Sequence, residues 1–218
     1  MQTNFMGNPF ECTSDTLIPR EETQILVNAA LRPILEQEAF EKDLILIELG
    51  TGCGNIASSI AMRTNRIRIL ASDISAKAVA IARRNIDAYK LGGRVSLFCG
   101  DLFTPFQDMG YQGKIDFVVC NPPYIPTASL KKLPSGILDR EPRVALDGGP
   151  YGIDIFRRLI AGSLAILKPG GMLFFEIGER QEKLAARLIE KGGGYDAVGY
   201  FENDGIVRAL SAKKKAAV

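Results

Sequence analysis

Short apolar runs alternate with longer amphipathic stretches along most of this chain. The short runs are rich in β-branched and aromatic residues and favour buried strands, whereas the longer stretches repeat apolar positions with helical spacing. The predicted strands cover residues 44–49, 67–72, 95–99, 115–120 and 172–177, with two further candidates at 196–201 and 206–210. The predicted helices cover residues 21–38, 55–63, 75–90, 153–167 and 180–191. This alternation predicts an α/β fold built on a doubly wound, mostly parallel sheet.

Three features interrupt the pattern. Pro33 lies within the first helical stretch and predicts a kink or a division there. Residues 125–152 form a long irregular stretch, and residues 168–171 (KPGG) are expected to end the helix before the fifth strand. Without repeats or a linker, the pattern predicts one domain over residues 1–218, with the segment and helix of residues 1–40 packed on its core.

The composition is that of a globular domain with a sizeable core. The 218 residues are 46% hydrophobic and 24% charged, and the formal net charge is only +2. The densest basic cluster, Lys213-Lys214-Lys215, is interpreted as a solvated end, so charge does not favour nucleic acid as a partner but leaves it possible. No apolar run approaches the roughly 20 residues of a membrane span, and the N-terminus lacks a signal-peptide pattern. We therefore expect no membrane partner and a cytoplasmic location.

Cysteine and histidine usage narrows the chemistry. Cys12, Cys53, Cys99 and Cys120 show neither CxxC pairing nor zinc-type spacing, which indicates reduced, buried or semi-buried residues and no metal site. The sequence contains no histidine. This excludes Ser-His and Cys-His nucleophilic catalysis, His-ligated metals and histidine as a general base. Any catalysis must therefore use positioning, carbonyl oxygens and carboxylates.

The most informative motif is Asn121-Pro122-Pro123-Tyr124, directly after the apolar run at 115–120. The Asn121 side-chain oxygen can accept one N–H of a planar –NH2 group, and the Pro122 carbonyl can accept the other, because the prolines fix the backbone. Tyr124 offers a flat face to the group that carries the nitrogen. A rigid Pro-Pro turn with a polar cap is the alternative interpretation of the motif taken alone.

A glycine-rich turn, residues 48–54 (ELGTGCG), follows the first predicted strand and lets the backbone approach a ligand closely. Its GxGxG spacing differs from the GxGxxG pattern of dinucleotide sites. Asp73 ends the second strand, where a carboxylate can accept both ribose hydroxyls, and Asp101 ends the third, where it can accept an exocyclic amine. Each acid taken singly is also explained as a helix cap or a turn residue. Together they favour a nucleoside bound without a pyrophosphate, a description that S-adenosylmethionine fits.

The candidate cofactor contacts are the turn, the two acids, their neighbours and the asparagine. They are Glu48, Gly50, Thr51, Gly52, Gly54, Asp73, Ile74, Asp101, Leu102 and Asn121. Glu48 either contacts the amino group of the cofactor or braces the glycine turn, and the sequence leaves both interpretations open.

Further matches extend along nearly the whole chain. In order, they are residues 16–20 (TLIPR), 22–23 (ET), the ELGTGCGNIA turn, Asp73, 100–103 (GDLF), 121–125 (NPPYI), 141–149 (EPRVALDGG), 167–171 (LKPGG) and 175–178 (FEIG). In order and spacing, these stretches resemble the protein-(glutamine-N5) methyltransferases of peptide-chain release factors, the HemK/PrmC family. The resemblance implies a class I, Rossmann-like fold with a seven-stranded, mostly parallel sheet, helices on both faces and a reversed last strand. It also implies S-adenosylmethionine as cofactor and a release factor as protein partner.

The residue chemistry and the resemblance together assign the acceptor side of the site. Catalytic roles fall to Asn121, Pro122 and Tyr124. Substrate contacts are expected from Asn121, Pro122, Pro123, Tyr124, Arg20 and Glu141, with an ordinary surface charge as the alternative for Glu141. Family members usually carry a helical N-terminal domain, whereas this sequence starts only about fifteen residues before the first matching stretch, and Glu21 stands where the family usually has proline. Both departures concern the substrate more than the chemistry.

The predicted reaction is transfer of a methyl group from S-adenosylmethionine to the side-chain amide nitrogen of a glutamine in a release factor. An amide lone pair is delocalised, so two fixed acceptors on its N–H bonds can align it without a strong base. Adenine-N6 methylation of DNA or RNA is an alternative, because adenine presents the same planar amino group, but the near-neutral charge counts against it. A small-molecule N-methyltransferase and a catalytically silent cofactor-binding scaffold are further alternatives.

Overall fold

The computed structural model describes residues 1–40 and 43–216. Its strands are β1 (Gln2–Phe5), β2 (Asn8–Glu11), β3 (Leu44–Leu49), β4 (Ile67–Asp73), β5 (Val95–Cys99), β6 (Ile115–Cys120), β7 (Leu167–Glu176), β8 (Tyr195–Asn203) and β9 (Ile206–Lys214). Its α-helices are α1 (Thr23–Glu38), α2 (Asn55–Arg63), α3 (Ala76–Ala88), α4 (Ile137–Arg140), α5 (Asp154–Ile166) and α6 (Glu182–Gly192). Three short 3₁₀ helices are η1 (Thr104–Phe106), η2 (Thr127–Lys132) and η3 (Arg143–Ala145).

Seven of the strands form one sheet in the order β5-β4-β3-β6-β7-β9-β8. The strands from β5 to β7 pair in parallel, whereas β9 runs antiparallel to both of its neighbours, β7 and β8. Parallel pairing requires a crossover connection for each strand, and helices supply most of these crossovers. The predicted α/β fold with a mostly parallel sheet and a reversed last strand is confirmed.

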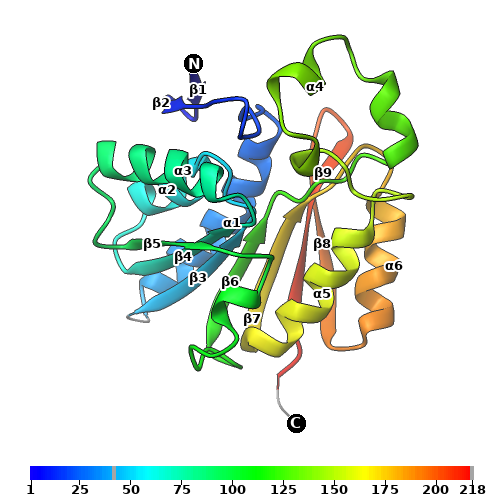
Figure 1. Cartoon of the computed structure of the whole chain (residues 1–218). Helices are drawn as coiled ribbons and strands as arrows, with labels where there is room; N and C mark the ends of the chain where they lie inside the picture. The colour runs from blue at the N-terminus through cyan, green and yellow to red at the C-terminus, as the bar shows by residue number, and fades with distance from the viewer. Residues whose placement is uncertain (41–42, 217–218) are drawn as a thin grey trace.

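Helices cover both faces of this sheet (Figure 1). α1, α2 and α3 pack with the N-terminal strands around a core that includes Phe10, Phe117 and Phe174. α5 and α6 pack on the other face, where Phe156 and Phe175 meet. Successive side chains of a strand point to opposite faces, which is why Phe174 and Phe175 belong to different cores.

A small hairpin, formed by β1 and β2, precedes α1, and the hydrophobic pattern does not predict it. Each strand has only four residues, too few for a periodic signal. Asn85 of α3 fixes the hairpin through two hydrogen bonds with the backbone of Glu11, and Arg84 pairs with the Glu11 carboxylate. α1 continues through Pro33 to Glu38, so the proline does not divide the helix.

The fifth central strand begins earlier than predicted. Leu167 pairs with Ile115 and Met172 pairs with Phe117, so residues 168–171 form an irregularity inside β7 instead of a turn before it. The pairing of Leu167 with β6 outweighs the turn propensity of the glycines. The interpretation of the terminal lysines as a solvated end is wrong for Lys214, whose Nζ donates to the carbonyls of Leu164 and Leu167, each at 2.7 Å. Lys214 thus caps the carboxyl end of α5.

The stretch predicted as irregular, residues 125–152, contains η2, α4 and η3. We call it the cover segment. Its two ends are joined, because Ile125 N donates to Leu146 O at 3.0 Å and Gly148 N donates to Ile125 O at 2.8 Å. Figure 1 shows α4 at the same end of the molecule as the N-terminal hairpin. The cover segment and the N-terminal segment, residues 1–22, therefore lie at the same end of the molecule.

Candidate functional site

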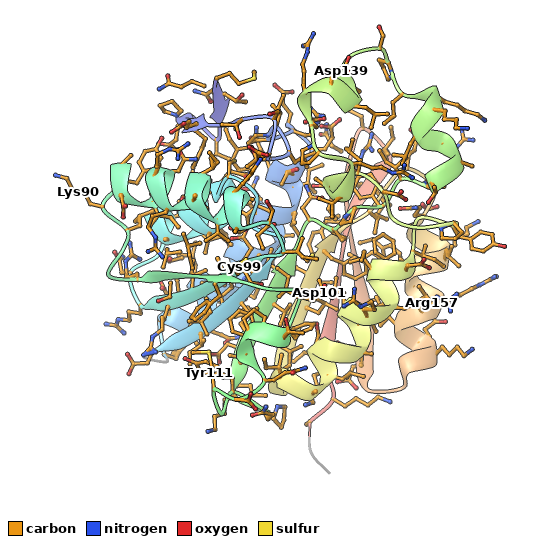
Figure 2. All side chains as sticks on the ribbon, viewed as in Figure 1. Lys90, Cys99, Asp101, Tyr111, Asp139 and Arg157 are labelled. Carbon is orange, nitrogen blue, oxygen red and sulfur yellow. The ribbon has the colours of Figure 1, made fainter. Side chains whose placement is uncertain are left out.

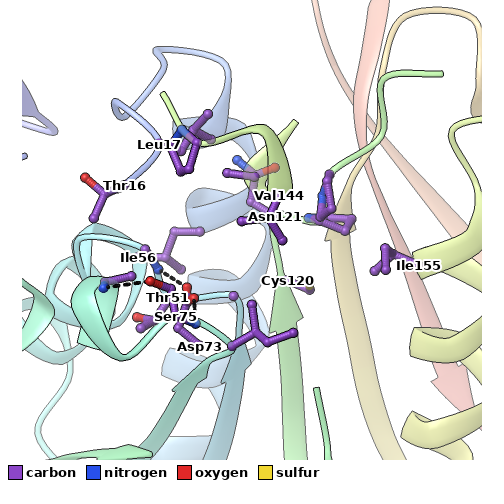
Figure 3. A pocket seen from close by; sticks show the side chains of 18 of the residues that line it. Thr16, Leu17, Thr51, Ile56, Asp73, Ser75, Cys120, Asn121, Val144 and Ile155 are labelled. Atoms are coloured by element: carbon purple, nitrogen blue, oxygen red, sulfur yellow. Dashed lines mark hydrogen bonds between the residues drawn. The ribbon is translucent and has the colours of Figure 1, made fainter. Parts of the chain in front are cut away.

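The carboxyl ends of the parallel strands border a cavity of about 210 Å³ (Figure 3). Leu17 of the N-terminal segment, Val144 of the cover segment and Ile155 of α5 line its other sides. The predicted cofactor contacts that line this cavity are Gly50, Thr51, Gly52, Asp73, Ile74, Asp101, Leu102 and Asn121. Two predicted contacts, Glu48 and Gly54, do not line it.

The glycine turn has a backbone that other residues rarely adopt. Gly50, Gly52 and Gly54 have φ angles of 69°, 55° and 81°. A Cβ on Gly54 would come within 3.2 Å of Ala82 Cβ, so this glycine permits close packing between the start of α2 and helix α3. Thr51 N donates to Ser72 O at 2.9 Å and joins the turn to β4. The first two glycines therefore face the cavity, and the third serves packing.

Glu48 lies beneath the turn and is fully buried. Its Oε2 accepts a hydrogen bond from Thr51 Oγ1 at 2.7 Å, whereas Oε1 has no partner among the described residues. Burial raises the pKa of Glu48 to about 8, so the side chain is mostly protonated at neutral pH. Of the two interpretations left open by the sequence, this geometry supports bracing of the turn.

Asp73 joins the turn to the next helix. Its Oδ2 accepts from Gly52 N and its Oδ1 accepts from Ser75 N, each at 2.9 Å. Burial raises the pKa of Asp73, opposed by these two backbone hydrogen bonds. Each carboxylate oxygen keeps further acceptor capacity, so the side chain can also receive two neighbouring hydroxyl groups from the cavity.

Asp101 lies at a more open side of the cavity, close to the middle of the molecule in Figure 2. Its Oδ2 accepts a hydrogen bond from Arg158 of α5 at 2.5 Å, and its side chain is 41% exposed. The next residue, Leu102, has a φ of 46°, and its carbonyl accepts from Ser72 Oγ at 3.2 Å. Arg158 therefore occupies one Asp101 oxygen, and the other can accept a hydrogen bond from a ligand amine.

A second cavity of about 180 Å³ adjoins the first. Both cavities are lined by Leu17, Asn121, Pro122 and Ala145. The second cavity is also lined by Arg20, Tyr124, Ile125, Leu133, Ile137 and Leu146, most of them apolar. The first two residues of the Asn-Pro-Pro-Tyr motif thus belong to both cavities, and Tyr124 belongs only to the second.

Within this motif, hydrogen bonds orient the side chains of Asn121 and Tyr124. Asn121 Nδ2 donates to Thr23 Oγ1 at 3.1 Å, which leaves the Asn121 oxygen as its free acceptor. The Tyr124 hydroxyl donates to Glu176 Oε1 at 3.1 Å. Burial raises the pKa of Tyr124, and the nearby Glu176 carboxylate raises it further. Gln181 Nε2 donates to the Tyr124 carbonyl at 3.0 Å and so fixes the backbone of the turn.

Arg20 and Glu141, both predicted substrate contacts, form an ion pair at 2.5 Å. The Glu141 side chain is only 1% exposed, and its Oε1 also accepts from Ile18 N at 2.8 Å. Glu141 is therefore no ordinary surface charge, because it joins the cover segment to the N-terminal segment. Arg20 lines the second cavity, whereas Glu141 does not.

Sequence reasoning assigned no role to four residues that the structure places at the site. These are Thr23, Arg158, Glu176 and Gln181. Thr23 and Glu176 lie in stretches that match the family pattern, and this match was the only sequence signal that could have assigned them to the site. Arg158 and Gln181 carried none, because their positions depend on how α5 and the loop before α6 pack beside the site.

Two absences apply to residues 1–40 and 43–216. Within these ranges, no group of three or more Cys, Asp or Glu side chains is arranged to hold a metal ion. None of the helices found there combines the length and apolar character that a membrane crossing requires.

Comparison with known proteins gives the family. A model of the methyltransferase small domain matches residues 25–134. The release factor glutamine methyltransferase of Geobacter sulfurreducens is 34% identical over 209 residues, which cover 96% of this chain and 69% of that protein. The chain belongs to the release factor glutamine methyltransferase family. The family member from Moorella thermoacetica is 40% identical over 191 residues, 88% of this chain, and the chain spans just under two thirds of its length, 64%.

Solved structures show the same fold at lower identity. The catalytic domain of hMettl16, in complex with a MAT2A 3′UTR hairpin, has a TM-score of 0.67 and 18% identity, and the match covers 93% of this chain and 74% of that one. A methyltransferase from Pyrococcus furiosus has a TM-score of 0.64 and 20% identity, with 96% and 90% covered. These structures confirm the class I methyltransferase fold that was predicted for this family member.

Proposed function

We propose that this protein transfers a methyl group from S-adenosylmethionine to the side-chain amide nitrogen of a glutamine in a peptide-chain release factor. One observation carries the proposal: Asn121 and Pro122 line both cavities. A donor in the first cavity and an acceptor in the second would meet at these two residues. The family relationship supports glutamine in a release factor as the acceptor.

The residues of the first cavity fit S-adenosylmethionine. The positive φ angles of Gly50 and Gly52 bring backbone close to the ligand without a Cβ in the way. Asp73 can accept the ribose hydroxyls, and the Asp101 oxygen that Arg158 leaves available can accept the adenine amine. When bound, this cofactor supplies an activated methyl group on a sulfonium sulfur.

Asn121 and Pro122 would hold the acceptor nitrogen. Asn121 Nδ2 donates to Thr23 Oγ1, so the Asn121 side-chain oxygen remains available to accept one N–H of the substrate –NH2 group. The Pro122 carbonyl can accept the second N–H. Two fixed acceptors would point the nitrogen lone pair toward the first cavity, and most of the rate gain would come from alignment and electrostatics.

The second cavity would select the acceptor by shape. Leu17, Leu133 and Ile137 give it apolar walls that suit the methylene groups of a glutamine side chain and exclude water from the amide. The nitrogen can lose its proton after methyl transfer, so no strong base is required. The expected cytoplasmic location of the protein remains a prediction.

The decisive experiment incubates the protein with S-adenosylmethionine and purified release factor and maps the added mass by tandem mass spectrometry. We expect one methyl group on one glutamine side chain. Asn121→Ala should lower the rate roughly 10²–10³-fold, because it removes one preorganised hydrogen-bond acceptor. Calorimetry should show that this variant still binds S-adenosylhomocysteine.

Two outcomes would contradict the proposal. If the wild-type protein binds the cofactor but leaves the release factor unmodified, the acceptor assignment is wrong, and adenine-containing oligonucleotides and small amines become the next substrates to assay. If Asn121→Ala methylates the release factor at the normal rate, the role of the asparagine is wrong.

A further inference from the structure

The last residue of β7 is a buried carboxylate that the proposed reaction does not use. Glu176 is 2% exposed. Its Oε1 accepts the hydrogen bond from the Tyr124 hydroxyl, and no described residue meets hydrogen-bond geometry at its Oε2, although the Thr23 hydroxyl lies near the carboxylate. We call residues 121–124 the acceptor turn. An unsatisfied buried carboxylate oxygen costs free energy, so its presence beside this turn needs an explanation.

Thr23 connects this carboxylate to the other end of the turn. Its side chain is buried, and its oxygen accepts the hydrogen bond from Asn121 Nδ2. The hydroxyl proton of Thr23 must therefore point elsewhere. The Thr23 hydroxyl lies beside Glu176 and lowers the pKa of its carboxyl group, although burial has the larger, opposite effect.

We propose that Glu176 is a positioning residue, which holds Asn121 through Thr23 and holds Tyr124 directly in the geometry that binds the acceptor amide. This inference rests on the proposed function. An ionised Glu176 can only accept hydrogen bonds, so it draws the protons of Thr23 and Tyr124 toward itself. The Thr23 oxygen then remains an acceptor for the Asn121 amide, which turns the Asn121 oxygen toward the substrate.

Protonation of Glu176 should weaken this arrangement. The pKa of Glu176 is raised to about 7: burial is the main cause and Glu22 of the segment before α1 adds to it, whereas Thr23, Tyr124 and Arg208 of β9 act in the opposite direction. The thiol of Cys120, at the end of β6, has a raised pKa, mainly because of burial, and the charge of Glu176 contributes to this. Below about pH 7 the carboxyl group becomes a donor and competes with the Asn121 amide for the Thr23 oxygen.

The backbone of the turn has separate supports. Gln181 donates to the Tyr124 carbonyl, and Gly178 N donates to Gln181 Oε1 at 2.8 Å. A neutral substitution of Glu176 should therefore leave the fold and the cofactor cavity in place and alter only the two side-chain orientations. This makes Glu176→Gln an informative variant.

The test compares Glu176→Gln with Glu179→Gln, a control with the same chemistry at an exposed position three residues on. On the release factor we expect Glu176→Gln to lower kcat roughly 10- to 100-fold with little change in KM. The wild-type kcat should fall as pH decreases through about 7, and the Gln variant should lose this step. Binding of S-adenosylhomocysteine should be the same for all three proteins.

A second readout does not depend on the acceptor. The side-chain amide signals of Asn121, assigned in ¹⁵N spectra by their loss in Asn121→Ala, should shift with a midpoint near pH 7 in the wild type and in Glu179→Gln. The shift should be absent from Glu176→Gln. The inference would be overturned if the Asn121 amide signals did not shift with pH in the wild type, or if they shifted by the same amount in Glu176→Gln. Failure of the wild type to methylate the release factor would overturn the proposed function alone, because these spectra still decide the role of Glu176.

Discussion

At the scale of single residues, the Asp73 carboxylate serves both the glycine turn and the first cavity. Its carboxylate accepts hydrogen bonds from Gly52 N and Ser75 N while facing the cofactor cavity. Its interpretation as a simple turn residue and its interpretation as a ligand contact are therefore compatible. The same oxygens shape the glycine turn and can receive the ribose.

We expect Asp73→Asn to weaken cofactor binding roughly 10- to 100-fold. The amide nitrogen of asparagine cannot accept a hydrogen bond, so one backbone N–H loses its partner, and hydrogen bonds to a charged group are worth about 1.5–3 kcal/mol each. Isothermal titration with S-adenosylhomocysteine measures the change. Asp87→Asn, an exposed site on α3, is the matched control. An unchanged dissociation constant for Asp73→Asn would exclude this residue from the cofactor site.

Glu48 gives a pH-dependent prediction. Its pKa is raised from 4.5 to about 8 by burial, so its contribution to stability is fully present below about pH 4.5 and is lost as pH rises through about 8. Glutamine is isosteric with the protonated form and does not ionise. We therefore expect the Tm difference between Glu48→Gln and wild type to move in favour of the variant as pH rises from about 5 to about 9.

Thermal melts over that pH range check the prediction, with the exposed Glu190→Gln as control. A Tm difference that stays constant across the range would mean that Glu48 is ionised in the folded protein at all these pH values.

At the scale of elements, the acceptor turn is packed against the end of the cover segment. A Cβ on Gly148 would lie 2.8 Å from the Pro123 carbonyl oxygen, from Tyr124 Cα and from Gly152 Cα. All three are backbone atoms, which cannot move away as the end of a flexible side chain can. Gly148 and Gly152, whose added Cβ atoms would both meet the backbone of Tyr124, therefore set how closely the cover segment approaches the turn.

We expect Gly148→Ala to lower methylation of the release factor about 100-fold, because a shift of about 1 Å in the acceptor turn misaligns the nitrogen. Binding of S-adenosylhomocysteine should remain, since the glycine turn of the first cavity is elsewhere. Gly93→Ala is the control, because a Cβ there meets nothing within 4 Å. If both variants were equally active, the packing of the cover segment would not control the turn.

At the scale of the whole molecule, the ion pair between Arg20 and Glu141 joins segments that are 121 residues apart in sequence. Glu141 also binds the Ile18 backbone, so one buried carboxylate holds the N-terminal segment against the cover segment. Arg20 is 38% exposed and stays solvated without its partner, but removal of Glu141 takes away both the ion pair and the acceptor of the Ile18 N–H. This contact therefore links the two segments that both contribute residues to the second cavity.

We expect Glu141→Ala to raise the KM for the release factor and to speed trypsin cleavage after Lys131 and Lys132, which are exposed on η2. Glu36→Ala removes an exposed pair with Arg32 on α1 and should change neither quantity. Time courses of proteolysis and steady-state kinetics provide the measurements. Equal cleavage rates for Glu141→Ala and wild type would show that the pair does not hold the cover segment.

The repeating pattern of apolar residues was sufficient for the central strands and most helices, because burial on one or both faces leaves a local trace in sequence. It failed where tertiary contacts dominate. Pairing with Ile115 places Leu167 in β7 despite the glycines that follow, and Lys214 becomes a helix cap because β9 passes the end of α5.

The sequence by itself determined the chemistry available to this protein: a glycine turn, acids at strand ends, an Asn-Pro-Pro-Tyr motif and no histidine. These signals are local, so neighbouring residues carry them. Only the tertiary structure decided how the side chains are oriented, because the deciding partners are remote. Thr23 lies 98 residues from Asn121, and Glu176 lies 52 residues from Tyr124. The order of the strands and the packing of α1 against the sheet bring these partners together, and no local pattern encodes either.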